Sequence, residues 1–167
     1  MELDVAVDKQ IYREAMARLG AAVNVITTDG PAGRAGFTAS AVCSITDTPP
    51  TLLVCANQKN DSYPIIRENA VLCVNTLAAG HIELSPVFAA MTDHAMEGRF
   101  ESASWHTLVT GAPVLDGALA AFDCRIEKIV ESGTHDVFFC EVEAVESDSM
   151  QDGLIYFARD YHFVQTK

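Results

Sequence analysis

The chain has 167 residues, of which 49% are hydrophobic and 20% charged, and its 23 acidic and 11 basic side chains give a formal net charge of −12. This length and composition predict a single globular domain over residues 1–167 and exclude a disordered polypeptide. The acidic balance argues against nucleic acid as a partner, because neutralising phosphates requires a dense basic surface.

Residues 8–20 are predicted to form the one clear amphipathic helix, which Asp8 caps at its N-terminus and Gly20 ends. The apolar stripe of this helix consists of Ile11, Ala15, Met16 and Leu19. Short helices are expected over 62–68, 81–91 and 93–100, with Pro86 forcing a break.

The rest of the chain alternates β-branched, apolar segments with turn residues. The segments expected to contain strands are 22–28, 37–45, 51–56, 71–77, 114–130, 135–147 and 154–158. Because long helices do not separate these strands, a doubly wound parallel sheet is disfavoured. The sequence predicts a mainly β fold of the α+β type, a closed or partly closed antiparallel barrel with flanking helices.

The N-terminal sequence and the cysteines predict a cytoplasmic protein. MELDVAVDKQ has neither the basic nor the apolar region of a secretory signal, and no stretch has the length of a bilayer span, so no membrane association is expected. The five cysteines follow no spacing typical of zinc or iron–sulfur ligands. We therefore expect reduced, half-buried thiols and no metal.

Motifs for phosphate binding and hydrolysis are missing: GxGxxG, GxxxxGK[ST], HExxH and GxSxG do not occur. Two other segments carry suitable residue types. Residues 36–41 combine small side chains with the hydroxyls of Thr38 and Ser40, which suits either a flat ligand lying on the backbone or a tightly packed barrel strand. Residues 57–62, with Lys59, precede a predicted helix and suit either one phosphate or an ordinary capped helix.

Two further segments stand near the C-terminus. His135 begins a predicted strand after the turn 132–134, where it can exchange a proton near neutral pH or serve only in the structure. Tyr156 and Arg159 lie close together, as in a site that stacks on a ring system, although aromatic side chains on a late strand also form cores.

Taken in this order, the segments resemble the short-chain flavin reductases, and within that family the reductase components of 4-hydroxyphenylacetate 3-monooxygenases. The resemblance runs from residue 12 to residue 164. The segments that carry it are YREAM (12–16), AAVNVITT (21–28), TASAVCS (38–44), TDTPP (46–50), LCVN (72–75), EGRF (97–100), GTH (133–135) and GLIYF (153–157).

The resemblance implies an FMN-binding split β-barrel, a Greek-key antiparallel barrel, that forms a homodimer with flavin sites near the interface. It implies NAD(P)H-dependent reduction of free FMN or FAD by hydride transfer to flavin N5. The reduced flavin would pass to a separate oxygenase component, one acting on an aromatic such as 4-hydroxyphenylacetate. The expected cofactors are FAD or FMN with NADH or NADPH, and the absence of an arginine cluster for a 2′-phosphate favours NADH. Alternatives are a flavin-binding barrel without turnover and a heme or pyridoxine-phosphate protein of similar shape.

The same resemblance implies roles for particular residues. His135 would position the nicotinamide, with Thr134 standing where many members have Asp. Residues 38–41 would follow the isoalloxazine edge, and Arg99 would assist at the phosphate. The residues expected to bind the cofactor are Thr38, Ala39, Ser40, Ala41, Cys55, Asn57, Lys59, Asn60, Ser62, Asn75, Arg99, Phe100, Gly133, Tyr156 and Arg159.

Overall fold

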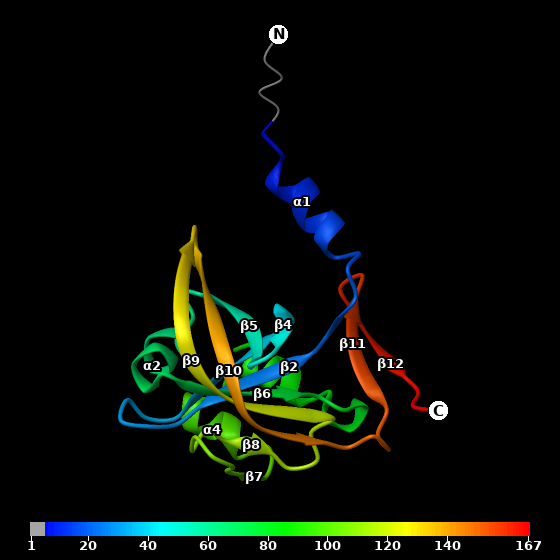
Figure 1. Ribbon diagram of the computed structural model, residues 1–167. Helices are drawn as coiled ribbons and strands as arrows, with labels where there is room; N and C mark the ends of the chain where they lie inside the picture. The colour runs from blue at the N-terminus through cyan, green and yellow to red at the C-terminus, as the bar shows by residue number, and fades with distance from the viewer. Residues whose placement is uncertain (1–5) are drawn as a thin grey trace.

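The computed structural model describes residues 6–167, and its largest element is a seven-stranded antiparallel sheet (Figure 1). The strands are β2 (Asn24–Thr28), β3 (Ala35–Ala39), β4 (Val42–Asp47), β5 (Pro50–Asn57), β6 (Val71–Thr76), β9 (Ala120–Ser132) and β10 (His135–Ser147). They lie in the order β3-β2-β6-β9-β10-β5-β4.

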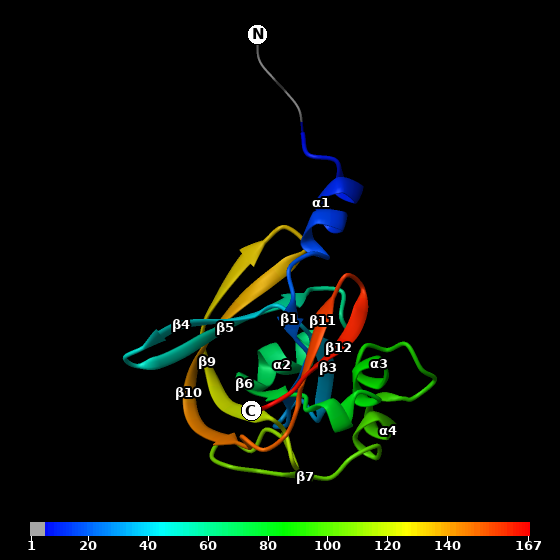
Figure 2. The same cartoon turned by 90° about the vertical axis from the view of Figure 1, so that its right-hand side faces the viewer.

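The two outermost strands of this order, β3 and β4, follow each other in the chain, and this connection curls the sheet into a barrel (Figure 2). Only Ser40 and Ala41 separate them, and the backbone amide of Cys55 on β5 donates to the carbonyl oxygen of Ala41 at 3.0 Å. The predicted antiparallel barrel is therefore confirmed.

Two smaller sheets complete the β-structure. The first contains β1 (Ala21–Ala22), β11 (Gly153–Phe157) and β12 (Asp160–Val164), and the second contains β7 (Trp105–His106) and β8 (Val114–Leu115). Strand β12 was not predicted. It forms because Ala158 and Arg159 adopt positive φ values of 53° and 63°, which turn the chain back on β11.

Alternating side chains of the same strands build two apolar cores. Ile26 points into the barrel with Phe138, whereas its neighbour Val25 packs with Phe88 on the other side of the sheet. This is why every residue of β2 is buried. The helices are α2 (Tyr63–Asn69), α3 (Leu84–Phe88) and α4 (Met96–Phe100). Helices α3 and α4 are shorter than the predicted ranges 81–91 and 93–100. They lie together on one side of the barrel (Figure 2).

Helix α1 (Lys9–Met16) begins as predicted but does not pack on the barrel. Asp8 caps it by accepting from the backbone amides of Gln10 and Ile11 at 2.8 and 3.1 Å. The helix ends earlier than predicted, none of its residues is buried, and it projects away from the rest of the chain (Figure 1). Ile11 and Leu19 are each 63% exposed, so the apolar stripe has no cover within the described residues.

The cysteines are free thiols, as predicted, but they are not uniformly half-buried. Cys73, Cys124 and Cys140 are buried, Cys55 is half-buried and Cys43 is exposed. Burial raises the pKa of the Cys140 thiol to about 12. Over residues 6–167 every helix falls short of the length and apolar character needed to cross a bilayer.

Candidate functional site

Three cavities with shared lining residues form a groove where β3 passes into β4. Their volumes are about 550, 200 and 160 Å³. The two larger cavities share Ser40 and Tyr156, and the two smaller ones share Ala89. The groove therefore runs past the small-residue segment 38–41.

The smallest cavity contains a buried guanidinium that lacks an acidic partner. Arg99 of α4 is 6% exposed, and its Nη1 donates to the carbonyl oxygen of Gly36 at 3.2 Å. Its Nε is buried without a hydrogen-bond partner, and no carboxylate forms a salt bridge with it among residues 6–167. Lys59 lines the same cavity. A buried cation without a partner is costly, so this end of the groove fits an anion such as a phosphate.

The loop 57–62 has its own hydrogen-bond frame. The side-chain oxygen of Asn57 accepts from the backbone amide of Lys59 at 2.9 Å, and that of Asn60 accepts from the amide of Ser62 at 2.8 Å. The Ser62 hydroxyl is fully buried and donates to the carbonyl oxygen of Gly36 at 2.8 Å. The structure therefore does not turn the Ser62 hydroxyl toward the groove, whereas Lys59 and Asn60 line it.

The middle cavity, of about 200 Å³, lies between the small residues of β3 and two aromatic side chains. Tyr156 and Tyr161 have ring centroids 5.3 Å apart. The Thr38 hydroxyl donates to the carbonyl oxygen of Ser85 at 2.7 Å, and the Ser85 hydroxyl lies 2.7 Å from that of Tyr161. With these hydroxyls paired, the wall offers mainly backbone and ring surface, which suits a flat ring system.

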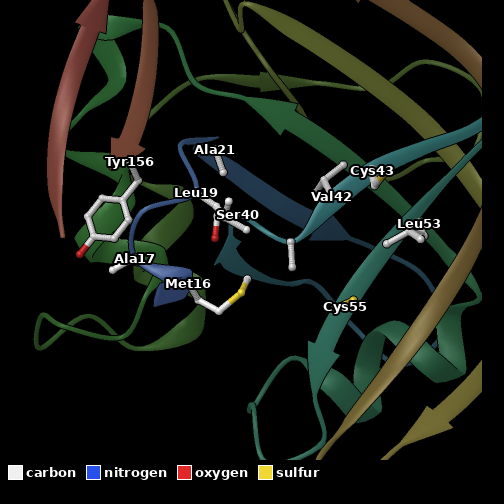
Figure 3. Close-up of a pocket in the computed structure, with 11 residues that line it drawn as sticks. Met16, Ala17, Leu19, Ala21, Ser40, Val42, Cys43, Leu53, Cys55 and Tyr156 are labelled. Atoms are coloured by element: carbon white, nitrogen blue, oxygen red, sulfur yellow. The ribbon is translucent and has the colours of Figure 1, made fainter. Parts of the chain in front are cut away.

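The largest cavity is mostly apolar and opens toward helix α1 (Figure 3). Met16 and Leu19 line it from the N-terminal segment, and Cys55 lines it from β5. Burial raises the pKa of the Cys55 thiol, so this sulfur is a neutral part of the wall at neutral pH.

His135 does not line any of the three cavities. It is the first residue of β10, is exposed, and lies opposite Asn57 of the neighbouring strand β5. Its Nδ1 lies 2.9 Å from the Thr134 hydroxyl, next to the turn in which Gly133 adopts a φ of 60°.

Two other predicted binding residues are engaged inside the protein. Asn75 is fully buried; its Nδ2 donates to the carbonyl oxygen of Val25 at 3.1 Å, and its Oδ1 accepts from the amide of Leu115 at 2.8 Å. Phe100 is 3% exposed and packs edge-on against Phe88.

A third predicted binding residue, Arg159, lies exposed at the β11–β12 turn and lines none of the three cavities.

The groove also contains residues that the sequence did not single out as binding residues. They are Met16, Ala17, Leu19, Ala21, Val23, Val42, Cys43, Leu53, Asp61, Ser85, Phe88, Ala89, Ala90, Met91 and Tyr161. The residues from α3 join the groove through tertiary packing, so no local motif marks them. Tyr161 of β12 could have been found from the sequence, because it follows the aromatic segment that contains Tyr156.

Residues 16–165 match the family model of the flavin reductase like domain, and the chain belongs to that family. The predicted family, enzyme class and fold class are thereby confirmed. A protein of Yersinia enterocolitica named FMN reductase (NADH) RutF is 61% identical over 158 residues, which cover 95% of this chain and 86% of that protein. The protein of the same name from Escherichia coli strain ATCC 8739 is 58% identical over 156 residues, covering 93% of this chain and 94% of that one.

Solved structures agree with this assignment. A putative flavin reductase from Haemophilus somnus 129PT superposes with a TM-score of 0.91 at 46% identity, covering 95% of this chain and all of the other. The flavin reductase PheA2 superposes with a TM-score of 0.86 at 29% identity, covering 95% of this chain and 99% of that one.

Proposed function

We propose that this flavin reductase uses NADH to reduce free FMN. The observation that carries the choice of a flavin with a phosphate is the Arg99 guanidinium, buried with an unpartnered Nε at a cavity of about 160 Å³ beside Lys59. A terminal phosphate fits this end, and a ring fits between residues 38–41 and Tyr156. Relatives from Yersinia enterocolitica and Escherichia coli are named FMN reductase (NADH), which supports both cofactors.

The residues of this chain act by binding and orientation. The two cofactors supply the chemistry, since the nicotinamide gives a hydride and the flavin accepts it. Arg99 and Lys59 hold the phosphate, and the backbone of residues 38–41 supports the ring edge. The mostly apolar cavity of about 550 Å³, called the outer cavity below, limits access of water. No side chain is needed as nucleophile or base, so His135 serves to position the nicotinamide.

Steady-state assays with FMN or FAD and NADH or NADPH test this function. We expect multiple turnovers in all active combinations and the highest kcat/KM with FMN and NADH. The alternative is a flavin-binding barrel without catalysis. Tightly bound yellow flavin that NADH does not bleach would favour that alternative.

Replacing His135 with alanine is expected to raise the KM for NADH about tenfold, because one hydrogen bond to a ligand is worth about 1.4 kcal/mol in this range. Hydride transfer in a single turnover should persist. Stopped-flow measurement of flavin bleaching separates the two effects. A complete loss of chemistry with unchanged NADH binding would make His135 a catalytic residue and contradict its positioning role.

We further propose that the reduced flavin passes to a separate oxygenase component in the cytoplasm. The groove lies along the surface, which suits release of the product, and the free thiols suit a reducing compartment. The sequence resemblance makes an oxygenase of an aromatic such as 4-hydroxyphenylacetate the first candidate. Hydroxylation of that compound by a purified oxygenase, dependent on this chain, NADH and flavin, is the test.

We also propose that residues 1–167 form a single domain that acts as a homodimer. Helix α1 has eight residues, none of them buried, and helices this short are marginal alone in water. Its apolar stripe continues into the outer cavity through Met16 and Leu19. A second copy that covers the stripe would stabilise the helix and close the cavity.

Leu19→Glu is therefore expected to shift the protein from dimer toward monomer, because it places a charge in the apolar contact. Sedimentation equilibrium measures the change. Val109→Glu is the matched control, since Val109 is 57% exposed and lies outside the groove. A monomeric wild-type protein, or equal behaviour of the two variants, would refute the proposed interface.

A further inference from the structure

One side chain joins two parts of the site that are far apart in the sequence. The backbone amide of Gln58 donates to the carbonyl oxygen of Thr134 at 3.0 Å, and its Nε2 donates to Oδ1 of Asp136 at 2.9 Å. Gln58 precedes Lys59, which lines the cavity of about 160 Å³ proposed to hold the phosphate (the phosphate cavity), while Thr134 and Asp136 stand on either side of His135. The loop 57–62, which we call the phosphate loop, is thus hydrogen-bonded directly to the strand end that carries His135.

The acceptor, Asp136, is itself held firmly. It is 2% exposed, and its Oδ2 accepts from the Tyr63 hydroxyl at 2.6 Å. Tyr63 begins α2, accepts from Nη1 of Arg67 at 2.8 Å, and stacks on Phe138. Hydrogen bonds from Tyr63 and Gln58 hold the pKa of Asp136 below its ordinary value, so the carboxylate is charged at neutral pH. Loop, helix and strand therefore meet at one buried charge.

The position of Asp136 also fixes that of His135. Neighbouring residues of a strand point to opposite faces, so when Asp136 turns inward to Tyr63 and Gln58, His135 turns outward. A hydrogen bond to a charged acceptor is stronger than a neutral one. Movement of the loop would therefore pull on the backbone of the residue beside His135.

We propose that Gln58 is a positioning residue that couples the phosphate loop to His135, so that one side chain sets the affinity for both flavin and nicotinamide. This inference rests on the function proposed above. Gln58 lines none of the three cavities, and it acts through Asp136 and the Thr134 carbonyl group.

The test is Gln58→Ala, which removes the bond to Asp136 and keeps the backbone bond to Thr134. We expect the Kd for FMN, followed by flavin fluorescence, and the KM for NADH each to rise about tenfold, the loss associated with one charged hydrogen bond. The kcat should stay within about twofold, because the rings still meet once both ligands are bound. Gln58→Glu should raise both constants further, since it sets a second carboxylate against Asp136.

Gln151→Ala is the matched control. Like the Nε2 of Gln58, that of Gln151 donates to a carboxylate oxygen, that of Asp148 at 3.1 Å; it further donates to the carbonyl oxygen of Gly117 at 2.7 Å, but Gln151 lines none of the three cavities. We expect it to change neither constant.

Unchanged constants in Gln58→Ala, or a rise for FMN alone, would overturn the coupling, even if thermal stability fell. Absence of turnover in the wild-type protein would instead refute the proposed function. Calorimetric binding of FMN and of NAD⁺ to the same variants would then decide the coupling by itself, with weakened binding of both ligands supporting it and weakened binding of one or neither overturning it.

Discussion

Replacing Arg99 with methionine is expected to raise the KM for FMN about 100-fold, because removing one member of a buried charge pair costs about 2–5 kcal/mol. The KM for riboflavin, which lacks the phosphate, should change less than about twofold. The variant should be at least as stable as the wild-type protein, because the buried guanidinium has an unpartnered Nε and no salt bridge within residues 6–167. Steady-state kinetics with both flavins, together with a thermal melt, measure these effects.

Arg125→Met controls for the change in net charge. Arg125 is exposed on β9 and pairs with Glu143 at 3.3 Å, outside the groove. We expect unchanged KM values for FMN and riboflavin in this variant. If Arg99→Met weakened both flavins equally, the role of Arg99 would be structural, and the phosphate cavity would have to lie elsewhere.

Gly36→Ala is expected to lower the free energy of unfolding by about 1–3 kcal/mol, the usual cost of overpacking a core. An added Cβ would lie 2.9 Å from Cε1 of Phe88 and 3.0 Å from the carbonyl oxygen of Ile26. Phe88 is 1% exposed, so its ring has no room to move away. At about 2–4 °C per kcal/mol for a chain of this size, the melting temperature should fall by several degrees.

The same substitution should also weaken FMN binding, because the carbonyl group of Gly36 accepts from both Ser62 and Arg99. Gly80→Ala is the control, since an added Cβ there meets nothing within 4 Å. Thermal melts and FMN titrations of both variants measure the outcome. A melting temperature of Gly36→Ala equal to that of Gly80→Ala would show that α3 moves aside, contrary to the packing described.

Polar side chains show where sequence interpretation reached its limit. Ser62 and Asn75 stand in the segments expected to bind flavin, yet both are fully buried and bonded to groups far away in the chain. A serine or asparagine looks the same in the sequence whether it faces a ligand or satisfies a backbone group. Lys59 and Arg99, by contrast, line one cavity in the structure, and their predicted role at a phosphate stays a prediction.

Helix α1 illustrates the same limit for apolar residues. The stripe through Ile11 and Met16 indicates that one face of the helix is to be covered, and Asp8 marks where the helix begins. The pattern does not indicate which surface covers the stripe. Within the described residues, the barrel does not cover it.

The sequence by itself determined most of the strand segments, the barrel class and the family, because these depend on local side-chain patterns and on an ordered set of motifs. Only the tertiary structure decided which polar groups remain available in the groove, that Tyr161 and α3 complete its wall, and that Gln58 joins the loop to His135. These features are contacts between residues distant in the chain. They depend on how the seven-stranded sheet curls into a barrel with β3 and β4 as its two edge strands. No local sequence pattern predicts that curvature.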